Sequence, residues 1–492
     1  MEYDKFFELA KSFSFVPVYE RIAADLLTPV LAYLKIREVN STSFLLESVE
    51  GIGRLARYSF IGVNPSEIIS NKRSELKIIA NSNEETKTEN LFNYLKAKIA
   101  GFNYPHLEEL PYFTGGLVGY LGFENISLIE DVIKFEEESI PIAPDSILGF
   151  YKTIIVFDHF KHQIILITNV DVSDKINVQS KYYDAKMIIK YLRTLLSKTV
   201  EHKSDFKAYP KELSIDEEDD FCILVEKSKR NIYDGDVFQI VLSRRFEADF
   251  VGDTFNVYRA LRMINPSPYM YFMEFENDFK VIGTSPEDLL KVKNGKAEIL
   301  PIAGTRRRGK SDEEDVRLEN DLMNDPKEIA EHVMLVDLAR NDLGRVCQYG
   351  TVKLSEEMKI NRFSHVMHIV SRVEGMLSKE NDCIDALKAS FPAGTVTGAP
   401  KIKAIQLINE YEKLNRGIYA GAVGYIDLSG NLDLCIAIRT LFAKGDKIYW
   451  QAGAGIVADS KPELEFKEIK NKSAVLLSAL KIAEVIDENL DN

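Results

Sequence analysis

The sequence Pro326-Lys327-Glu328-Ile329-Ala330-Glu331-His332 begins the segment that decides how this chain folds. Proline at the start, an early glutamate and apolar residues spaced three and four apart predict a helix over 326–344. Residues three apart are neighbours on one face of a helix, so Glu328 and Glu331 point the same way.

The same glutamate spacing recurs in a second predicted helix over 462–486, where it places Glu465 beside Glu468. Four carboxylates brought together repel one another, and a hard divalent cation such as Mg²⁺, which prefers oxygen ligands, removes that repulsion. Pairs of this kind are also common on solvated helix faces. The spacing alone therefore leaves both a metal site and two exposed acidic faces open.

Outward from these helices, short strand-like runs outnumber strand–helix–strand crossovers. They are expected at 43–48, 75–80, 149–158, 163–169, 237–245 and 434–441, and a further helix is expected at 221–231. This pattern predicts an α+β fold with large antiparallel sheets that form a sandwich-like core flanked by helices. The polar stretch 199–220 suggests a boundary between an N-terminal region, 1–205, and a catalytic domain, 215–492.

The amino-acid composition excludes several classes of function. The chain has 492 residues and a net charge of −14, without the basic stripe of a nucleic-acid-binding protein. The first residues lack a signal-peptide pattern, and no apolar run is long enough to span a bilayer. The four cysteines form no C-x-x-C pair, which favours reduced thiols in a cytoplasmic protein.

Nine short sequence motifs in the second half of the chain carry a specific family resemblance. They include Gly394-Thr395-Val396-Thr397-Gly398-Ala399-Pro400-Lys401, and the others lie at 238–244, 283–287, 301–306, 327–332, 335–342, 367–371, 417–425 and 451–457. Together and in this order they resemble the chorismate-utilising enzymes, most nearly the large subunits (component I) of anthranilate synthases. The resemblance is strong over about 221–483 and extends to 45–48 and 57–60.

The resemblance implies a ligand set for chorismate, a dicarboxylate. Mg²⁺ would be held by Glu328, Glu331, Glu465 and Glu468 against the ring carboxylate. Substrate-binding groups would be Thr395, Tyr419, Arg439, Gly453, Gly455, Lys472 and Gln239. For three of these residues a plainer role stays open: a turn-stabilising hydroxyl for Thr395, a solvated helix lysine for Lys472 and a surface ion pair for Arg439.

Two residues resemble the catalytic groups of the family. Glu287 matches the general acid that protonates the departing C4 hydroxyl, a step that needs an acid because hydroxide leaves poorly. His368 matches a histidine beside the ring that assists deprotonation or elimination. An exposed turn glutamate and a structural histidine are the alternatives.

Two positions select among members of the family. Members that add water at C2 use a lysine base where this chain has Gln239, and a glutamine cannot act as a base. Members that make aminodeoxychorismate carry a lysine where this chain has Ala303. Both departures favour amination followed by loss of pyruvate, which gives anthranilate. Aminodeoxychorismate synthase component I is the nearest alternative, and an inactive scaffold is a distant one.

The nitrogen source and the regulator follow from the same resemblance. No cysteine lies in a nucleophile elbow, so free ammonia is the expected substrate, and glutamine use would need a separate amidotransferase subunit, component II. Residues similar to the tryptophan feedback site are Glu47, Ser48, Pro268, Tyr269 and Met270. Related aminodeoxychorismate synthases share much of this pocket, so a purely structural role is the alternative.

Overall fold

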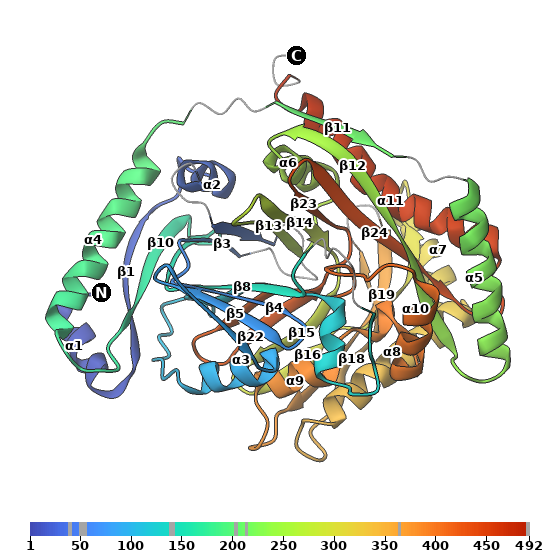
Figure 1. Cartoon of the computed structure of the whole chain (residues 1–492), viewed down its shortest axis with the longest axis horizontal. Helices are drawn as coiled ribbons and strands as arrows, with labels where there is room; N and C mark the ends of the chain where they lie inside the picture. Colours follow the sequence, from blue (N-terminus) through green and yellow to red (C-terminus); the bar gives the residue numbers. More distant parts are fainter. Residues whose placement is uncertain are drawn as a thin grey trace.

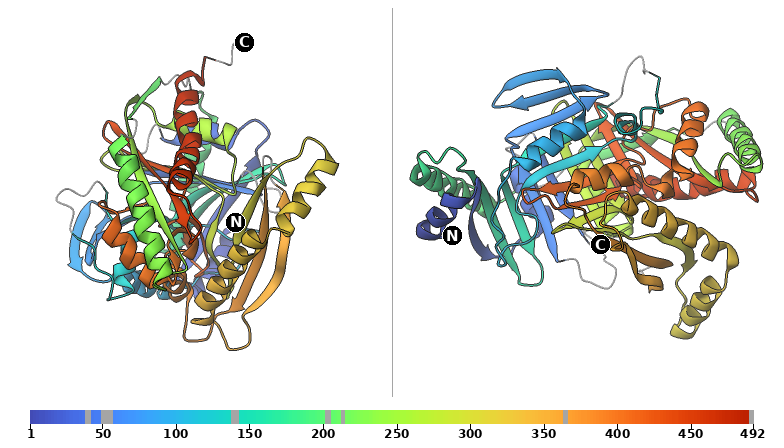
Figure 2. Two further views of the ribbon diagram at one scale, coloured as in Figure 1. Left: turned by 90° about the vertical axis from the view of Figure 1, so that its right-hand side faces the viewer. Right: turned by 90° about the horizontal axis from the view of Figure 1, so that it is seen from below.

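The computed structural model describes residues 1–37, 42–48, 57–136, 143–200, 205–211, 215–362 and 366–488. Within them the strands form two 12-stranded sheets in which every pairing is antiparallel, with helices on the outer faces (Figures 1 and 2). The predicted fold class, α+β with two large antiparallel sheets, is confirmed. None of the described helices has the length and apolar character that a membrane crossing requires.

The first sheet joins a block of strands from the N-terminal part of the sequence to a block from the C-terminal part. Its order is β1 (Phe15–Ala23), β10 (Gln163–Asp171), β9 (Thr153–Asp158), β3 (Tyr58–Val63), β2 (Ser43–Glu47), β13 (Tyr269–Phe275), β14 (Phe279–Ser285), β23 (Thr440–Lys444), β24 (Lys447–Ile456), β12 (Gln239–Gly252) and β11 (Phe206–Pro210), with β20 (Gly398–Ala399) beside β12.

The second sheet also joins a block of strands from the C-terminal part of the sequence to a block from the N-terminal part. Its order is β17 (Ile302–Arg307), β19 (Val366–Met376), β16 (Lys296–Ile299), β15 (Asp288–Lys293), β22 (Leu432–Ile436), β21 (Ala422–Asp427), β7 (Gly116–Leu121), β8 (Ser146–Tyr151), β4 (Glu67–Lys72), β5 (Glu75–Ala80) and β6 (Asn83–Thr88), with β18 (Lys353–Arg362) beside β19.

The described helices cover the sandwich from outside. They are α1 (Tyr3–Ser12), α2 (Pro29–Arg37), α3 (Leu91–Ala100), α4 (Val178–Ser197), α5 (Ile215–Tyr233), α6 (Phe255–Ile264), α7 (Asp312–Met323), α8 (Pro326–Gly344), α9 (Cys383–Ser390), α10 (Lys401–Tyr411) and α11 (Pro462–Val485), with the 3₁₀ turns η1 (Phe123–Leu128) and η2 (Gly394–Val396). Helices α5 and α11 lie side by side (Figure 2).

Three large apolar clusters among the described residues hold these layers together, and a small fourth one packs α7 against β19. One fills the space between the sheets with side chains such as Phe44 and Tyr271 from the first sheet and Tyr120 and Tyr151 from the second. The other two large clusters pack helices onto the outer faces: α1, α2, α4, α6 and α11 on the first sheet, and α3, α8 and α9 on the second.

The predicted helix over 326–344 is confirmed residue for residue as α8. Its first turn is capped by the Asp325 side chain, which accepts hydrogen bonds from the Lys327 and Glu328 amides, and Pro326 needs no such partner. The second predicted helix is confirmed as α11, which begins at Pro462.

Two of the predictions are wrong, because each expected single strand is broken into two strands. The run 149–158 breaks at Lys152 into the end of β8 and all of β9, and the run 434–441 breaks at 437–439 between β22 and β23. In both cases the chain passes from one sheet to the other. An apolar run cannot reveal such a crossing, because the residues on both sides of it are buried.

Both sheets contain strands from either side of the proposed domain boundary. Strand β2 pairs with β13 in the first sheet, and β7 pairs with β21 in the second. Residues 201–204 and 212–214 of the boundary stretch lie outside the described residues. The division into 1–205 and 215–492 stays a prediction about sequence regions that share one sandwich.

The centre of the second sheet predicts a severe effect of one added methyl group. A Cβ at Gly119 in β7 would lie 1.9 Å from the Ile147 carbonyl oxygen, a backbone atom of the paired strand. We expect Gly119→Ala to lower the free energy of unfolding by about 3 kcal/mol, because a core that is already close-packed cannot accept the extra atom. Urea unfolding followed by the fluorescence of Trp450, the single tryptophan, measures this change.

Gly344→Ala at the end of α8 is the control, because a Cβ there meets nothing within 4 Å. Its free energy of unfolding should stay close to that of the unmodified chain. Equal losses in the two variants would contradict the packing argument.

Candidate active site

Two neighbouring crossovers between the sheets carry predicted site residues. Glu287 lies between β14 and β15, and Arg439 lies between β22 and β23. The Ile436 amide donates to the Glu287 carbonyl (3.0 Å), and the Thr284 amide donates to the Arg439 carbonyl (3.2 Å). Arg439 has φ = +49°, in the left-handed region that residues with a Cβ seldom adopt, so the tertiary structure imposes its conformation.

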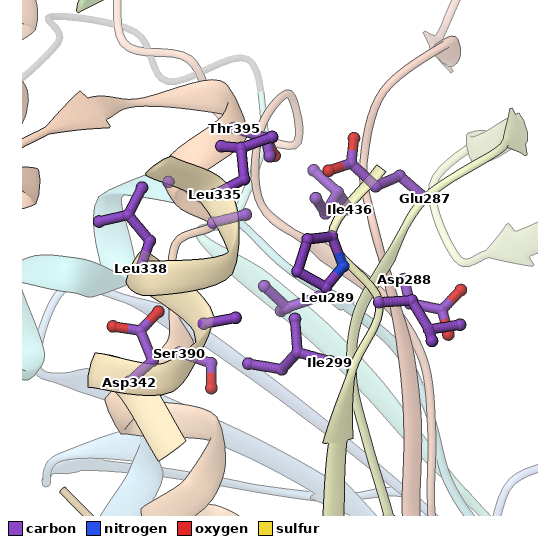
Figure 3. A pocket seen from close by; sticks show the side chains of 15 residues that line it. Glu287, Asp288, Leu289, Ile299, Leu335, Leu338, Asp342, Ser390, Thr395 and Ile436 are labelled. Atoms are coloured by element: carbon purple, nitrogen blue, oxygen red, sulfur yellow. The ribbon is translucent and has the colours of Figure 1, made fainter. Parts of the chain in front are cut away.

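Glu287 borders a small cavity of ≈40 Å³ with a mostly apolar wall. Figure 3 shows its carboxylate at the same end of this cavity as Thr395, with Leu335 and Leu338 of α8 along the side. Burial raises the pKa of Glu287 to about 7; the Asp288 carboxylate adds to the rise, and Thr395, Lys472 and Arg439 oppose it. A carboxyl group with this pKa still carries its proton in much of the population at neutral pH, as a general acid requires.

Thr395 occupies the 3₁₀ turn η2 and faces Glu287. Its hydroxyl is close enough to counter the rise in the pKa of Glu287, yet its buried Oγ1 makes no hydrogen bond of normal geometry to any described residue. A buried hydroxyl without a partner is costly, which is the condition expected of a group that binds a ligand.

His368 lies on β19 with its ring orientation fixed. Nδ1 donates to the Gly304 carbonyl (2.8 Å), with the Thr305 hydroxyl 3.1 Å away. Nε2 is therefore the basic nitrogen of the neutral ring. Burial lowers the pKa of His368, the Gly304 hydrogen bond opposes this, and the Arg439 charge lowers the pKa further. The imidazole is accordingly neutral at pH 7, in the form that accepts a proton.

Five of the predicted substrate-binding residues meet along β24: Gln239, Tyr419, Gly453, Gly455 and Lys472. A Cβ at Gly453 would lie 2.6 Å from the Tyr419 hydroxyl, and a Cβ at Gly455 would lie 2.6 Å from the Gln239 side-chain nitrogen. At Gly453 the Leu242 carbonyl oxygen also lies 2.9 Å from such a Cβ, so a side chain there would strain the strand, whereas at Gly455 it would displace the Gln239 amide. Lys472 donates from Nζ to the Gly453 carbonyl (2.9 Å), so a lysine of α11 also reaches this strand.

The four predicted metal ligands come near one another without forming a cluster. Burial raises the pKa of Glu331, and Glu328 and Glu468 add to the rise, so the pair on α8 faces α11. Burial also raises the pKa of Glu465. Among the described residues, however, no three His, Cys, Asp or Glu side chains lie close enough to hold an ion.

Two basic side chains each form an ion pair with one of these four carboxylates. The Arg306 guanidinium binds Glu328 (3.3 Å), and Lys472 binds Glu468 (2.7 Å). The Arg306 contact is a feature that the sequence did not reveal, because β17 and α8 become neighbours only in the fold. The donor set itself, carboxylate oxygens under mutual repulsion, fits a hard cation such as Mg²⁺.

All five residues of the predicted regulatory site line one cavity of ≈1130 Å³ between the two sheets: Glu47, Ser48, Pro268, Tyr269 and Met270. The Glu47 carboxylate accepts hydrogen bonds from the Tyr258 hydroxyl (2.5 Å) and from Arg262 (3.1 Å). Asp288, next to the predicted acid, lines both this cavity and the small one at Glu287. Its role in a shared wall was not evident from the sequence.

Comparison with known proteins agrees with this geometry. A family model described as chorismate binding enzyme matches residues 48–478. Anthranilate synthase component 1 of Acetivibrio thermocellus is 43% identical over 484 residues, which are 96% of this chain and 97% of that protein. The Aquifex aeolicus protein of the same name is 42% identical, with 98% of each chain covered.

The chain belongs to the chorismate-binding enzymes, within the anthranilate synthase component 1 group.

A solved structure agrees with this assignment. The crystal structure of anthranilate synthase component I from Streptococcus pneumoniae matches this chorismate-binding enzyme with a TM-score of 0.74 and 38% identity. The match covers 93% of this chain and 99% of that chain.

The environment of Glu287 predicts a linked loss of activity and gain of stability on substitution. Glu287→Gln should lower kcat by about 10²–10⁴-fold, because an amide cannot protonate a leaving hydroxide. The folded-state pKa of about 7 lies above the ordinary 4.5. The unmodified chain therefore loses stability as the pH rises from about 4.5 to 7, and the variant does not. Above pH 7 the variant should be more stable by up to about 3 kcal/mol.

Turnover assays and urea unfolding at pH 5 and pH 8 measure both effects. Glu276→Gln, in an exposed turn of the same sheet, is the control and should change neither. A stability difference that is equal at the two pH values would count against a protonated Glu287.

Proposed function

We propose that this chain converts chorismate and ammonia to anthranilate and pyruvate. The observation that carries the proposal is the position of Gln239, whose neutral amide lies beside Gly455 in the strand where carboxylate-binding amides are expected. A side chain that cannot act as a base suits an ammonia nucleophile, which needs no deprotonation once it is neutral. The full-length likeness to anthranilate synthase component 1 proteins supports the same reaction.

Different residues of the chain carry out the different steps of this reaction. Protonated Glu287 delivers its proton to the C4 hydroxyl as that group leaves, while ammonia adds at C2. His368 Nε2 then accepts the proton from ring C2 as the C–O bond to the enolpyruvyl group breaks, and the released enolpyruvate takes up a proton to become pyruvate. Arg439, the Tyr419 hydroxyl and the amides near Gly455 hold the enolpyruvyl carboxylate, because paired donors favour the charged form.

Two further residues orient the ring. The Thr395 hydroxyl binds the ring carboxylate, and Lys472 provides a cation to the same dianionic substrate. Glu328, Glu331, Glu465 and Glu468 would hold Mg²⁺, which supplies charge neutralisation at the ring carboxylate when it is bound.

Aminodeoxychorismate synthase component I is the second candidate, since it shares chorismate, ammonia and this pocket architecture. Ala303 disfavours it, because its side chain offers no amine where those enzymes carry lysine. Hydration to isochorismate is disfavoured by Gln239, and an inactive scaffold is disfavoured by the retention of Glu287 and all four metal-site glutamates.

Glutamine-derived ammonia would come from a separate amidotransferase subunit, component II, in the cytoplasm. The name component 1 of the relatives supports a partner of this kind. The chain by itself should use ammonium and not glutamine.

Tryptophan is the proposed regulator, bound in the large cavity between the sheets. Glu47 and Ser48 end one strand of its wall, and the Pro268 turn forms another part. Asn265, at the start of that turn, accepts a hydrogen bond from the Arg439 side chain (3.3 Å). A ligand that moves the turn can thus act on a substrate-binding arginine, which gives the two sites a physical connection.

The first experiment is fluorescence of the purified chain with chorismate, Mg²⁺ and ammonium at alkaline pH, with pyruvate assayed in parallel. We expect anthranilate and pyruvate to rise together and EDTA to abolish both. Glutamine in place of ammonium is the control and should give neither product. Chorismate consumption without pyruvate would favour aminodeoxychorismate or isochorismate instead, and no consumption would favour the scaffold.

Ser48→Phe tests the regulatory site, because the larger ring would fill space in the proposed tryptophan pocket. We expect the tryptophan concentration for half-inhibition to rise about tenfold or more while uninhibited turnover stays near its original value. Inhibition curves at fixed chorismate measure this. Ser173→Phe, at an exposed turn, is the matched control. Unchanged tryptophan sensitivity in Ser48→Phe would exclude this pocket.

A further inference from the structure

One arginine that no predicted role includes is buried among the site-bearing elements. Arg416 is 2% exposed and forms a two-armed ion pair with Glu412, in which Nε and Nη2 each donate to a carboxylate oxygen at 2.8 Å. The same carboxylate accepts hydrogen bonds from the Ser243 amide (2.8 Å) and hydroxyl (2.9 Å) on β12. The pair is therefore tied to the strand that carries Gln239.

The other donors of Arg416 reach two backbone carbonyls of the site. Nη1 donates to Val396, the residue after Thr395, and Nη2 donates to Val241, both at 2.7 Å. Val241 lies opposite Gly455 in the pairing of β12 with β24. One planar cation therefore bridges the 3₁₀ turn of Thr395 and the strands of Gln239 and Gly455, which a guanidinium can do because its donors point in fixed directions.

The guanidinium also lies beneath Tyr419. Its carbon is 5.6 Å from the centre of the Tyr419 ring and 4.7 Å from that of Phe123. Glu124, in η1, accepts hydrogen bonds from the amides of Arg416 (2.7 Å) and Gly417 (3.0 Å), which fixes the loop that leads to Tyr419.

We propose that Arg416 is a positioning residue that sets the spacing of Thr395, Gln239, Gly455 and Tyr419 around the substrate. This inference rests on the proposed function, in which these residues bind chorismate. Arg416 itself touches no substrate, because its guanidinium is enclosed by Glu412 and by the elements that it joins. Its effect should therefore fall on chorismate binding before it falls on the chemical step.

The test uses the full chain with ammonium as nitrogen donor. Arg416→Met combined with Glu412→Gln removes both charges of the ion pair together, so neither partner of the pair is left buried without the other. The amide at 412 still accepts a hydrogen bond from Ser243. Arg416→Lys keeps the charge but cannot span both carbonyls and the carboxylate.

In the double variant we expect the KM for chorismate to rise about tenfold or more, with a smaller change in kcat and cooperative unfolding retained. Arg416→Lys should recover part of the loss. Hydrogen exchange should become faster in peptides that cover 394–399, and stay unchanged in β1 and β10. A wild-type KM in the folded double variant, or faster exchange in β1 and β10 to the same extent, would overturn the proposal.

Arg37→Lys is the matched control, since Arg37 also forms a buried ion-pair network, with Asp253 (2.7 Å) and Glu274 (2.7 Å), away from the site. It should lower the melting temperature and leave the KM for chorismate unchanged. If the unmodified chain makes no anthranilate, the proposed function fails by itself. The exchange measurement needs no turnover and still decides whether Arg416 positions the 394–399 turn.

Discussion

The hydrogen bonds between two neighbouring sheet crossovers are the constraint on which the rest of the site depends. Each crossover takes the chain out of one sheet and into the other, so its residues lie at the edge of the interior rather than within a ladder. The Ile436 amide ties one crossover to the Glu287 carbonyl, and the Thr284 amide ties the other to Arg439. An acid and a cation are thereby fixed side by side, and the strained backbone of Arg439 is held at its carbonyl by the first sheet.

This arrangement gives the two proposed sites separate places in one fold. The small cavity at Glu287 and the large cavity between the sheets share Asp288 in their walls. Asn265, three residues before Pro268 of the cavity wall, accepts a hydrogen bond from Arg439, and Tyr269 donates to Asp433 (2.7 Å) within that wall. A ligand in the large cavity would thus contact elements that position Glu287 and Arg439, without entering the small cavity at Glu287.

The sequence predicted the fold class and both glutamate-bearing helices, and its family resemblance singled out Glu287, Thr395 and Arg439, which the fold brings near one another. Helix periodicity and proline caps are local signals, so α8 could be predicted to the residue. The crossings at Lys152 and at 437–439 could not, because burial on both sides keeps the apolar pattern continuous. Arg416 was missed for a related reason: its partners Val241 and Val396 lie far away in the sequence, and each contact is through a backbone carbonyl that no residue type marks.

The carboxylates of α8 and α11 show why residue spacing could not predict the metal site in full. Spacing places two oxygens on a face, but the surrounding cations decide what those oxygens bind. Arg306 binds Glu328 and Lys472 binds Glu468, so repulsion among the four carboxylates is partly neutralised by the protein's own charges. A divalent cation must compete with these ion pairs. Since Lys472 also holds the Gly453 carbonyl, metal binding and the carboxylate-binding strand share one side chain, and the proposed metal and substrate sites are coupled through it.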